Sequence, residues 1–309
     1  MPTVSVIIPN YNHAPFLKQR IESVLNQSFQ DFEMILIDDC STDGSREIIE
    51  SYRNNPHVSH IVYNDSNSGS AFLQWNKGIE LAKGDWIWVA ESDDYAEPTF
   101  LEHLLREATK TSDSVLVYAA TWWVDEHGNK LWNTPDSDQV NLYSGQDFIR
   151  KKLATRNSIA NVSECLFRRD SYHPDETYRY EHMRFCGDWF FYVLLAGQGS
   201  VVEVCQPLSY YRQHGSNISE EAEHRGLTFL EGIDVLEYMK QHYALKIKDY
   251  ARGWGHLWAR YKRRYNFPPE VQKKIRRRFM THHPEIYTYY LIFNYLKRKK
   301  QQYFPIQPN

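Results

Sequence analysis

The chain has 309 residues, of which 42% are hydrophobic and 24% charged, and its formal net charge is -3. This composition is typical of a folded globular protein and excludes a largely disordered chain. The four cysteines show no C-x-x-C pair or other metal-ligand spacing, so we expect no disulfide framework, no zinc site and a reducing, cytoplasmic setting. We expect neither secretion nor membrane spanning, because a strand pattern begins by Val4 and no apolar run could cross a bilayer.

Two patterns alternate over the first 115 residues. Nearly continuous apolar runs predict buried strands, and apolar residues spaced three and four apart predict helices. The predicted strands cover residues 4–8, 34–37, 58–63 and 86–90, and the helices lie near residues 17–25, 45–49 and 71–82. This alternation implies right-handed crossovers, so we predict an α/β, Rossmann-like fold with a mostly parallel central sheet flanked by helices.

Polar or aromatic residues follow three of these strands. They are Tyr11 and Asn12 after the first strand, Asp38 and Asp39 after the second, and Glu91, Asp93 and Asp94 after the fourth. Ligands of parallel sheets bind beyond the carboxyl ends of the strands, so we expect these residues to line one crevice. Tyr11 offers a face for a base, and Asp38 or Asp39 can accept hydrogen bonds from a base or ribose.

The acidic triplet after the fourth strand suggests a cation. Crowded carboxylates repel one another unless a cation lies between them, and Mg²⁺ or Mn²⁺ favours oxygen ligands. A divalent ion at Asp93 would offset the charge of a diphosphate. A solvated acidic turn is the alternative, because Asp and Ser are ordinary turn residues.

The second half adds further aromatic and ionisable side chains. A strand over residues 115–121 leads to Trp122 and Trp123, whose indoles can cover the apolar face of an acceptor sugar or simply pack in the core. Asp188 stands among apolar and aromatic neighbours, which would strengthen it as a proton acceptor, although a helix N-cap is the alternative.

The segment at residues 207–217 carries two more groups that suit a site for a charged ligand. Arg212 can pair bidentately with phosphate. His214 can supply a metal ligand or a hydrogen bond, or can be a solvated histidine.

The C-terminal region differs in charge from the rest. Residues 246–309 hold 16 Lys and Arg against 3 Asp and Glu, which gives a net charge of +13 against -16 for the first 245 residues. We predict a helical, basic extension over residues 220–309 that meets an anionic surface. Peripheral attachment to anionic lipid and a helical hairpin on the body or on a second subunit, as in a homodimer, both remain open. Nucleic acid is not expected, because no nucleic-acid-binding motif is present.

Four motifs resemble, in their order and spacing, the nucleotide-sugar-binding half of family 2 glycosyltransferases. They cover residues 5–12, 37–45, 67–69 and 91–94, and the resemblance extends roughly over residues 3–215. It implies a GT-A fold and inverting transfer of a sugar from a nucleotide diphosphate donor, most commonly UDP, usually with Mg²⁺ or Mn²⁺. The catalytic domain would span residues 1–219, with a nucleotide-sugar half to about residue 115 and an acceptor half from about residue 116.

The resemblance also implies roles for individual residues, with Asp188 as the general base. The expected nucleotide-binding set is Pro9, Tyr11, Asn12, Asp38, Asp39, Asn67, Gly69 and Asp93, and the expected metal ligands are Glu91, Asp93, Asp94 and His214. Arg212 would approach the diphosphate. Inverting transfer is a single displacement, so no Ser or Cys is assigned as a nucleophile.

Three positions depart from the family pattern. Glu91 replaces the usual first Asp of the D-x-D motif, Trp75 replaces a frequent Arg, and Gly187 replaces the acidic residue that often precedes the base. Two alternatives to a surface-polysaccharide or glycolipid glycosyltransferase therefore stay open: a non-catalytic nucleotide-sugar or glycan-binding protein, and a sugar-1-phosphate nucleotidyltransferase. The second lacks its usual glycine-rich basic loop.

Overall fold

The structure is a computed structural model of the chain, and it describes residues 1–134, 136–173, 179–215, 225–263 and 267–282. It divides into two compact units, Met1–Leu153 with Asn157–Asn217, and Ala154–Arg156 with Ile218–Asn309. The predicted domain boundary at residues 219 and 220 lies outside the described residues and stays a prediction. The basic, aromatic run near residues 287–300 also lies outside them.

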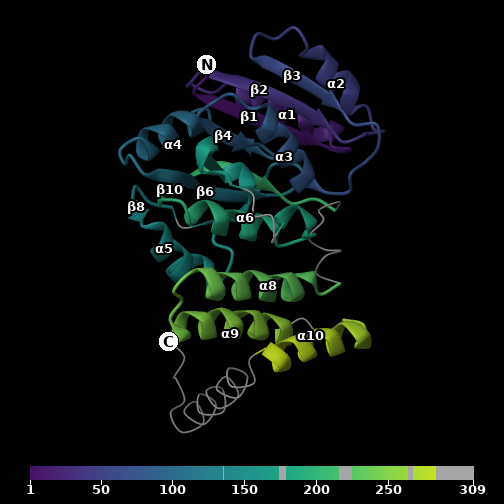
Figure 1. Cartoon of the computed structure of the whole chain (residues 1–309). Helices are drawn as coiled ribbons and strands as arrows, with labels where there is room; N and C mark the ends of the chain where they lie inside the picture. Colours follow the sequence, from purple (N-terminus) through teal and green to yellow (C-terminus); the bar gives the residue numbers. More distant parts are fainter. Residues whose placement is uncertain (135, 174–178, 216–224, 264–266, 283–309) are drawn as a thin grey trace, which may run out of the picture. The chain divides into compact units, whose positions relative to one another are not determined.

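The first unit is built on a ten-stranded mixed sheet (Figure 1). Its strands are β1 (Val4–Asn10), β2 (Phe32–Asp38), β3 (Val58–Tyr63), β4 (Trp86–Val89), β5 (Tyr95–Ala96), β6 (Ser114–Val124), β7 (Lys130–Asn133), β8 (Val140–Tyr143), β9 (Cys165–Arg168) and β10 (Ser200–Arg212). The order across the sheet is β3-β2-β1-β4-β9-β6-β10-β5, with β7 beside β6 and β8 beside β10.

The sheet is only partly parallel. β3, β2, β1 and β4 run parallel, as the strand–helix alternation predicts. β9 enters between β4 and β6 antiparallel to both, because a short 3-10 turn at Val162–Glu164 leads into it instead of a crossover helix. The mostly parallel sheet that we predicted is therefore a mixed one beyond β4.

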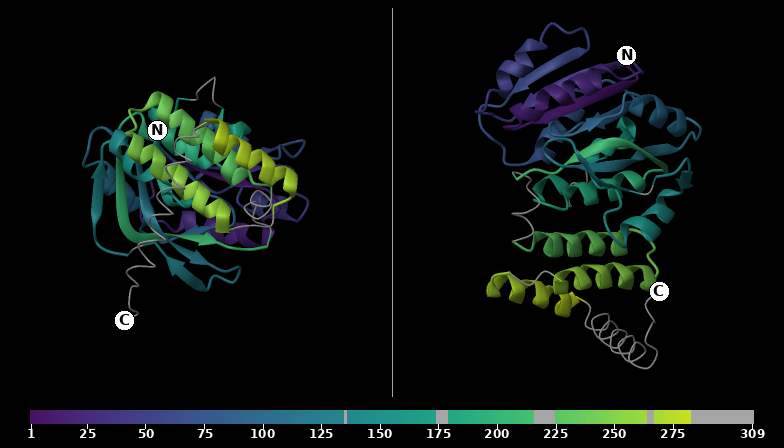
Figure 2. Two further views of the ribbon diagram at one scale, coloured as in Figure 1. Left: turned by 90° about the horizontal axis from the view of Figure 1, so that it is seen from below. Right: turned by 180° about the vertical axis from the view of Figure 1, so that it is seen from behind.

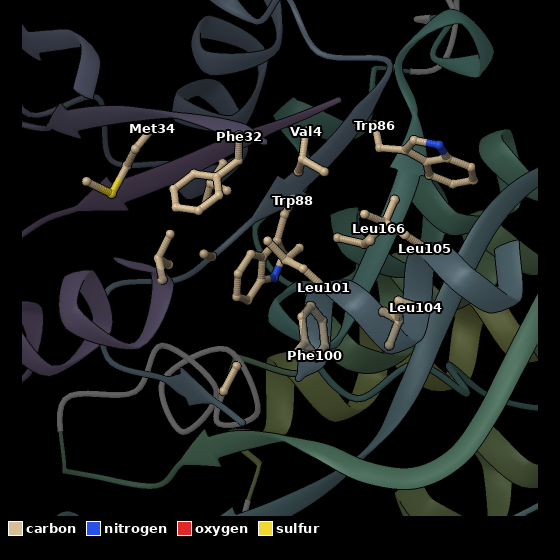
Figure 3. Packing of buried hydrophobic residues seen from close by; sticks show 14 of the residues in the cluster. Val4, Phe32, Met34, Trp86, Trp88, Phe100, Leu101, Leu104, Leu105 and Leu166 are labelled. Atoms are coloured by element: carbon tan, nitrogen blue, oxygen red, sulfur yellow. The ribbon is translucent and has the colours of Figure 1, made fainter. Parts of the chain in front are cut away.

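Helices cover both faces of this sheet. They are α1 (Ala14–Leu25), α2 (Ser45–Ser51), α3 (Ala71–Leu81), α4 (Phe100–Ala108), the short α5 (Gly145–Phe148) and α6 (Gly187–Ala196). Alternate residues of β1, β2 and β4 form a buried cluster with side chains of α1, α2 and α4. Within it the rings of Trp88 and Phe100 stack at 4.6 Å (Figure 3). The opposite face of the sheet is covered by α3 and α6.

The packing of α3 and α6 depends on two glycines. A Cβ on Gly78 of α3 would lie 2.3 Å from Cγ2 of Ile7 on β1. A Cβ on Gly187 would lie 2.5 Å from the ring of Phe72. Each glycine therefore lets its helix approach closely, and the start of α6, where Asp188 stands, is held against α3.

The parallel arrangement brings the strand ends together. Asn10 on β1 pairs with Asp38 on β2, and the backbone N of Ala90, directly after β4, donates to the carbonyl of Ile7. The carboxyl ends of three neighbouring strands therefore meet at one edge of the sheet.

The second unit is helical, as predicted (Figure 2). Its described helices are α8 (Leu227–His242), α9 (Ile247–Arg263) and α10 (Pro269–His282). Aromatic rings form much of its core; Phe279 of α10 lies 4.9 Å from both Trp254 and Trp258 of α9. In the part of the chain that the structure describes, we find no helix with the length and apolar character needed to traverse a bilayer.

We predict that Gly84→Ala destabilises the first unit. A Cβ at this position would lie 2.5 Å from the backbone N of Ser5 and 2.6 Å from the carbonyl carbon of Val4, and backbone atoms cannot move aside cheaply. We expect a loss of about 1–3 kcal/mol in the free energy of unfolding, measured by urea denaturation. Gly215→Ala, where no atom lies within 4 Å of the added Cβ, is the control and should stay near the wild-type midpoint.

Candidate active site

The loops after β1 and β2 are tied together by side-chain hydrogen bonds. The backbone N of Asn12 donates to Oγ of Ser41 at 2.9 Å, and Oδ1 of Asn12 accepts from the backbone N of Thr42 at 2.8 Å. Asp38 is fully buried and accepts from Nδ2 of Asn10 at 3.0 Å and from Nε of Arg46 at 3.3 Å. Asp38 therefore accepts its hydrogen bonds from other side chains of the protein. Together these contacts fix the conformation of the strand-end loops.

Asp39 holds a third loop at the same edge. Its carboxylate accepts from Nδ2 of Asn64 at 2.6 Å and from Oγ of Ser68 at 2.7 Å. The neighbouring Asn67 accepts from the backbone N of Gly69 at 2.8 Å, and Gly69 has a φ of 72°, which an L side chain rarely adopts. A base or ribose at Asp39 would have to share oxygens that already accept hydrogen bonds.

Tyr11 lies in the same loop region but points outward. Its side chain is 45% exposed, whereas Pro9, two residues earlier on β1, is buried. The exposed ring is a surface on which a flat base can stack.

The carboxylates of the acidic motif after β4 have little exposure and are hydrogen-bonded within the protein: Asp94 is buried, and Glu91 and Asp93 are half-buried. Glu91 accepts a 2.7 Å hydrogen bond from Nε1 of Trp75, and its backbone N donates to Oγ of Ser163 at 3.0 Å. Asp94 accepts from the backbone N of Arg212 at 2.9 Å and from Nδ2 of Asn161 at 2.8 Å. Trp75 therefore supplies Glu91 with a donor where the family pattern often has a cation, and Asp94 ties β10 to the motif.

Asp93 stands between two histidines. Nε2 of His214 lies 2.9 Å from Oδ2 of Asp93, and Nδ1 of His13 lies 2.8 Å from Oγ of Ser92. Ligand atoms of His13, Asp93 and His214 lie within 4.8 Å of one another, and within the described residues no other group of His, Cys, Asp and Glu converges in this way. These three residues could hold a metal ion.

A buried arginine lies beneath the motif. The Arg20 side chain is fully buried, its Nε donates to the carbonyl of Glu91 at 2.8 Å, and its guanidinium faces the Trp88 ring at 5.5 Å. Burial lowers the pKa of Arg20 to about 10, partly offset by the nearby carboxylates, so it stays charged at neutral pH. Arg20 therefore supplies positive charge to the acidic cluster.

The carboxylates of the motif titrate differently. Burial, reinforced by the charge of Asp93, raises the pKa of Glu91 to about 8 and that of Asp94 to about 7. Burial would also raise the pKa of Asp93, but the hydrogen bond with His214 and the nearby His13 lower it overall. Asp93 is therefore the carboxylate that stays ionised most readily.

Asp188 stands in the first turn of α6, one residue after its start, and does not occupy the N-cap, which is Cys186. Its Oδ1 accepts from the backbone N of Trp189 at 2.6 Å, and its Oδ2 accepts from Nδ2 of Asn157 at 2.9 Å. Asn157 thus orients one oxygen of a half-buried carboxylate.

Arg212 is nearly fully buried and already bound within the protein. Its Nε donates to the carbonyl of Asp93 at 2.8 Å, its Nη1 to the carbonyl of Glu126 at 2.8 Å and its Nη2 to Oε1 of Gln19 at 2.7 Å. Pairing with a phosphate would compete with these bonds, so that role stays a prediction.

The two tryptophans of β6 are partly exposed rather than core residues. Nζ of Lys130 lies 4.2 Å from the Trp122 ring, and Trp123 stacks on the half-exposed Trp132 at 4.5 Å. Both rings are thus in contact with neighbours on β7.

Sequence reasoning missed four residues that complete this region: His13, Arg20, Asn157 and Asn161. His13 directly follows the strand-end motif at Tyr11 and Asn12, so its position along the chain could have indicated it. Arg20 lies three residues after Leu17 on the buried face of α1, and a charge on an apolar helix face is also a recognisable signal. Asn157 and Asn161 are positioned by long-range folding and give no local signal.

Comparisons with known proteins agree with this architecture. A model of the family described as glycosyl transferase family 2 matches residues 5–174. TuaG of Bacillus subtilis, a glycosyltransferase named for teichuronic acid biosynthesis, is 42% identical over 104 residues, which are 34% of this chain and 41% of TuaG. The chondroitin synthase of Pasteurella multocida is 35% identical over 156 residues, 50% of this chain and 15% of that protein. The matched segments span less than half of each relative.

A solved structure supports the fold over most of the chain. The crystal structure of S. aureus TarS 1-349 in complex with UDP aligns with a TM-score of 0.65 at 17% identity, covering 90% of this chain and 80% of that one. At this identity the likeness concerns the fold alone. It confirms the predicted GT-A-like fold.

We predict that Glu91 makes the free energy of unfolding of the metal-free protein depend on pH. A carboxyl group whose folded pKa is raised stabilises the fold below its unfolded value, and this contribution is lost as the pH rises through the folded value. For Glu91 the window runs from 4.5 to about 8, so the free energy of unfolding should fall across it. Glu91→Gln keeps an acceptor for Trp75. It should reduce the fall in the free energy of unfolding by on the order of a few kcal/mol.

The measurement is urea denaturation at pH 5 and pH 8 in the presence of a chelator. Glu80→Gln removes an exposed carboxylate from α3, the helix that carries Trp75, and serves as the control. An equal fall in wild type and Glu91→Gln would show that Glu91 is not the group responsible.

Proposed function

The chain belongs to glycosyl transferase family 2, and from that membership we propose that it transfers a sugar from a nucleotide diphosphate sugar to a glycan or lipid-linked acceptor. The observation that carries the proposal is the meeting of three strand-end motifs at one sheet edge, inside the segment that matches the family. Relatives named for teichuronic acid and chondroitin support a role in polysaccharide or glycolipid synthesis. A structural neighbour crystallised with UDP supports a UDP-sugar as the donor.

The donor would lie over the edge formed by β1, β2 and β4. The exposed ring of Tyr11 would stack on the base, while Asp39 and the loop at Asn67 and Gly69 would face the base or ribose. Asp93 would lie toward the diphosphate. The parallel register of the strands and the exposure of Tyr11 support this assignment.

The donor set fits a divalent cation, as two imidazoles and one carboxylate lie close together at His13, Asp93 and His214. A bound cation would offset negative charge on the departing diphosphate. Glu91 and Asp94 would stabilise the loop that carries Asp93 and would not bind the ion directly, because hydrogen bonds within the protein hold both carboxyl groups.

Asp188 would act as the general base of an inverting transfer. It would accept the proton of the acceptor hydroxyl as that oxygen attacks the sugar, in one displacement without a covalent enzyme intermediate. The hydrogen bond from Asn157 would keep one carboxylate oxygen oriented. The acceptor sugar would approach along Trp122 and Trp123, whose partly exposed rings offer an apolar surface.

The basic helices would bring the enzyme to its acceptor. Exposed Lys273, Lys274 and Arg277 on α10 present a cationic surface in the described part of the second unit. We propose that this surface binds anionic lipid at the inner face of the membrane, with the chain otherwise in the cytoplasm. Association of two copies is the competing use of the surface.

We predict that Asp188→Asn abolishes transfer and leaves donor binding unchanged. Loss of a general base lowers turnover about 10²–10⁴-fold, whereas the substitution leaves the strand-end loops unchanged. The assay incubates the protein with UDP-sugars, Mn²⁺ and candidate acceptors, and a thermal-shift titration with UDP and Mn²⁺ reports donor binding separately. Asp147→Asn in α5, at a side chain that is 40% exposed and pairs with Lys151, is the matched control.

Two results would contradict this assignment. Full transfer by Asp188→Asn would remove Asp188 from the base role. Saturable UDP binding by the wild type, with neither hydrolysis nor transfer for any donor, would favour a non-catalytic nucleotide-sugar-binding protein.

We predict that reversing charge at Lys273, Lys274 and Arg277 to Glu weakens binding to vesicles that contain anionic lipid. Each basic residue near such a surface contributes about 1 kcal/mol, so the triple change should reduce flotation strongly. The control carries the same charge change on the first unit, at the exposed Lys18, Lys110 and Lys151. Equal loss in both variants would indicate a general charge effect, and unchanged flotation would remove α10 from this role.

A further inference from the structure

We propose that residues 157–164 form a positioning segment, which fixes Asp188 relative to the acidic motif after β4, and that the buried Glu164 holds this segment in its conformation. The inference rests on the proposed sugar transfer and adds Glu164 to it as a positioning residue. The segment, the motif and Asp188 all belong to the first unit.

Two asparagines of the positioning segment contact two different parts of the site. Nδ2 of Asn157 donates to Oδ2 of Asp188 at 2.9 Å, and Nδ2 of Asn161 donates to Oδ2 of Asp94 at 2.8 Å. The two asparagines are four positions apart, so their Cα atoms lie at most about 14 Å from each other. One short stretch of chain therefore limits how far Asp188 and the acidic motif can move apart.

The 3-10 turn at the end of the segment is attached to the motif a second time. Oγ of Ser163 accepts from the backbone N of Glu91 at 3.0 Å, and the carbonyl of Ser163 accepts from Nε1 of the buried Trp88 at 2.9 Å. Oδ1 of Asn161 caps the turn by accepting from the backbone N of Ser163 at 2.8 Å. Because the same asparagine also binds Asp94, the turn cannot shift without disturbing that contact.

Glu164 holds the segment from the interior of the protein. Its side chain is 2% exposed, and Oε1 accepts from the backbone N of Ala160 at 2.8 Å. Burial raises the pKa of Glu164 well above its ordinary value, and the hydrogen bond from Ala160 opposes only part of this rise. Glu164 therefore acts as a fixed hydrogen-bond acceptor and not as a charge.

Packing alone does not account for a carboxyl group at this position. Oε2 of Glu164 is buried and has no hydrogen-bond partner among the described residues. Burying a polar atom without a partner is unfavourable, and a Leu side chain would fill similar space without that cost. The bond to Ala160 is the feature that Leu cannot supply.

The segment bears on catalysis because a general base must lie within hydrogen-bond reach of the proton that it accepts. Asn157 ties Asp188 to a part of the chain outside α6, and a misplacement of about 1 Å can lower a rate about 100-fold. The loops at Asn12 and Asp39 are held by separate hydrogen bonds. Loosening the positioning segment should therefore slow turnover and leave nucleotide binding intact.

The test compares Glu164→Leu with Glu164→Gln in the full chain, assayed with UDP-sugars, Mn²⁺ and candidate acceptors. Glu164→Leu should lower kcat about 10- to 100-fold, while the donor KM and the Kd for UDP stay within about threefold of wild type. Glu164→Gln keeps an acceptor for Ala160 and should recover most of the lost turnover. The matched control is Glu107→Leu, which removes another buried carboxyl group in the last turn of α4 and should leave kcat near wild type.

Amide hydrogen exchange gives a readout that does not require transfer. Glu164→Leu should speed exchange in peptides that cover residues 157–161 and residues 187–189, where the backbone N of Trp189 donates to Asp188. Glu164→Gln and Glu107→Leu should leave both peptides near wild type. If Glu164→Leu does not fold, Asn161→Ala takes its place, because it removes the donor to Asp94 and should produce the same losses.

Three results would overturn the proposal. They are unchanged kcat or unchanged exchange at residues 187–189 in both Glu164→Leu and Asn161→Ala, equal loss of turnover in Glu164→Leu and Glu164→Gln, and a loss of UDP binding as large as the loss of kcat. If the wild type transfers no sugar from any donor, faster exchange at residues 187–189 in Glu164→Leu would leave the positioning segment standing and refute the proposed activity.

Discussion

The structure depends on how three carboxylates are accommodated at the end of β4. Burying Glu91, Asp93 and Asp94 together is unfavourable, because ionised groups lose hydration and repel one another. This cost is offset by the buried cation at Arg20 and by a hydrogen-bond donor for each carboxylate. Removing the partner of Asp93, the carboxylate that stays ionised, would leave its charge uncompensated, which is more costly than the net contribution of any single contact.

This constraint also connects two departures from the family pattern. Glu91 is longer than the usual Asp, and its carboxylate meets the indole N–H of Trp75 at 2.7 Å. Trp75 is itself buried and packs against Phe72 and Phe191. A neutral donor here fits a carboxyl group whose pKa is raised to about 8, because it does not require the ionised form. The two substitutions are therefore physically compatible with each other.

The sequence predicted the parts of the fold that local patterns encode. The first strands were recognisable because they are buried on both faces and so read as continuous apolar runs, as at residues 34–37. β9 was not recognisable, because it has four residues and lies between two short 3-10 turns. Its antiparallel pairing, together with that of β5, β7 and β8, makes the sheet a mixed one.

Prediction of the site from the sequence is limited in the same way. Asp93 and His214 could be proposed from motifs, and Asp188 from its apolar neighbours, but the sequence did not show that Asp38 and Arg212 are bound mainly within the protein. Hydrogen bonds such as that from Asn157 to Asp188 join positions 31 residues apart. Local periodicity carries no information on such pairs, because they depend on the completed tertiary packing.

One detail of the chain path connects the helical unit to the chemistry. Residues Ala154–Arg156 belong to the helical unit, and the chain then returns to the sheet unit at Asn157, which bonds to Asp188. A Cβ on Gly253 of α9 would lie 2.1 Å from the carbonyl oxygen of Ala154, so the segment Ala154–Arg156 packs closely against α9. Removing the C-terminal helices would therefore take away the packing of Ala154–Arg156, the three residues directly before the Asn157 that bonds to Asp188.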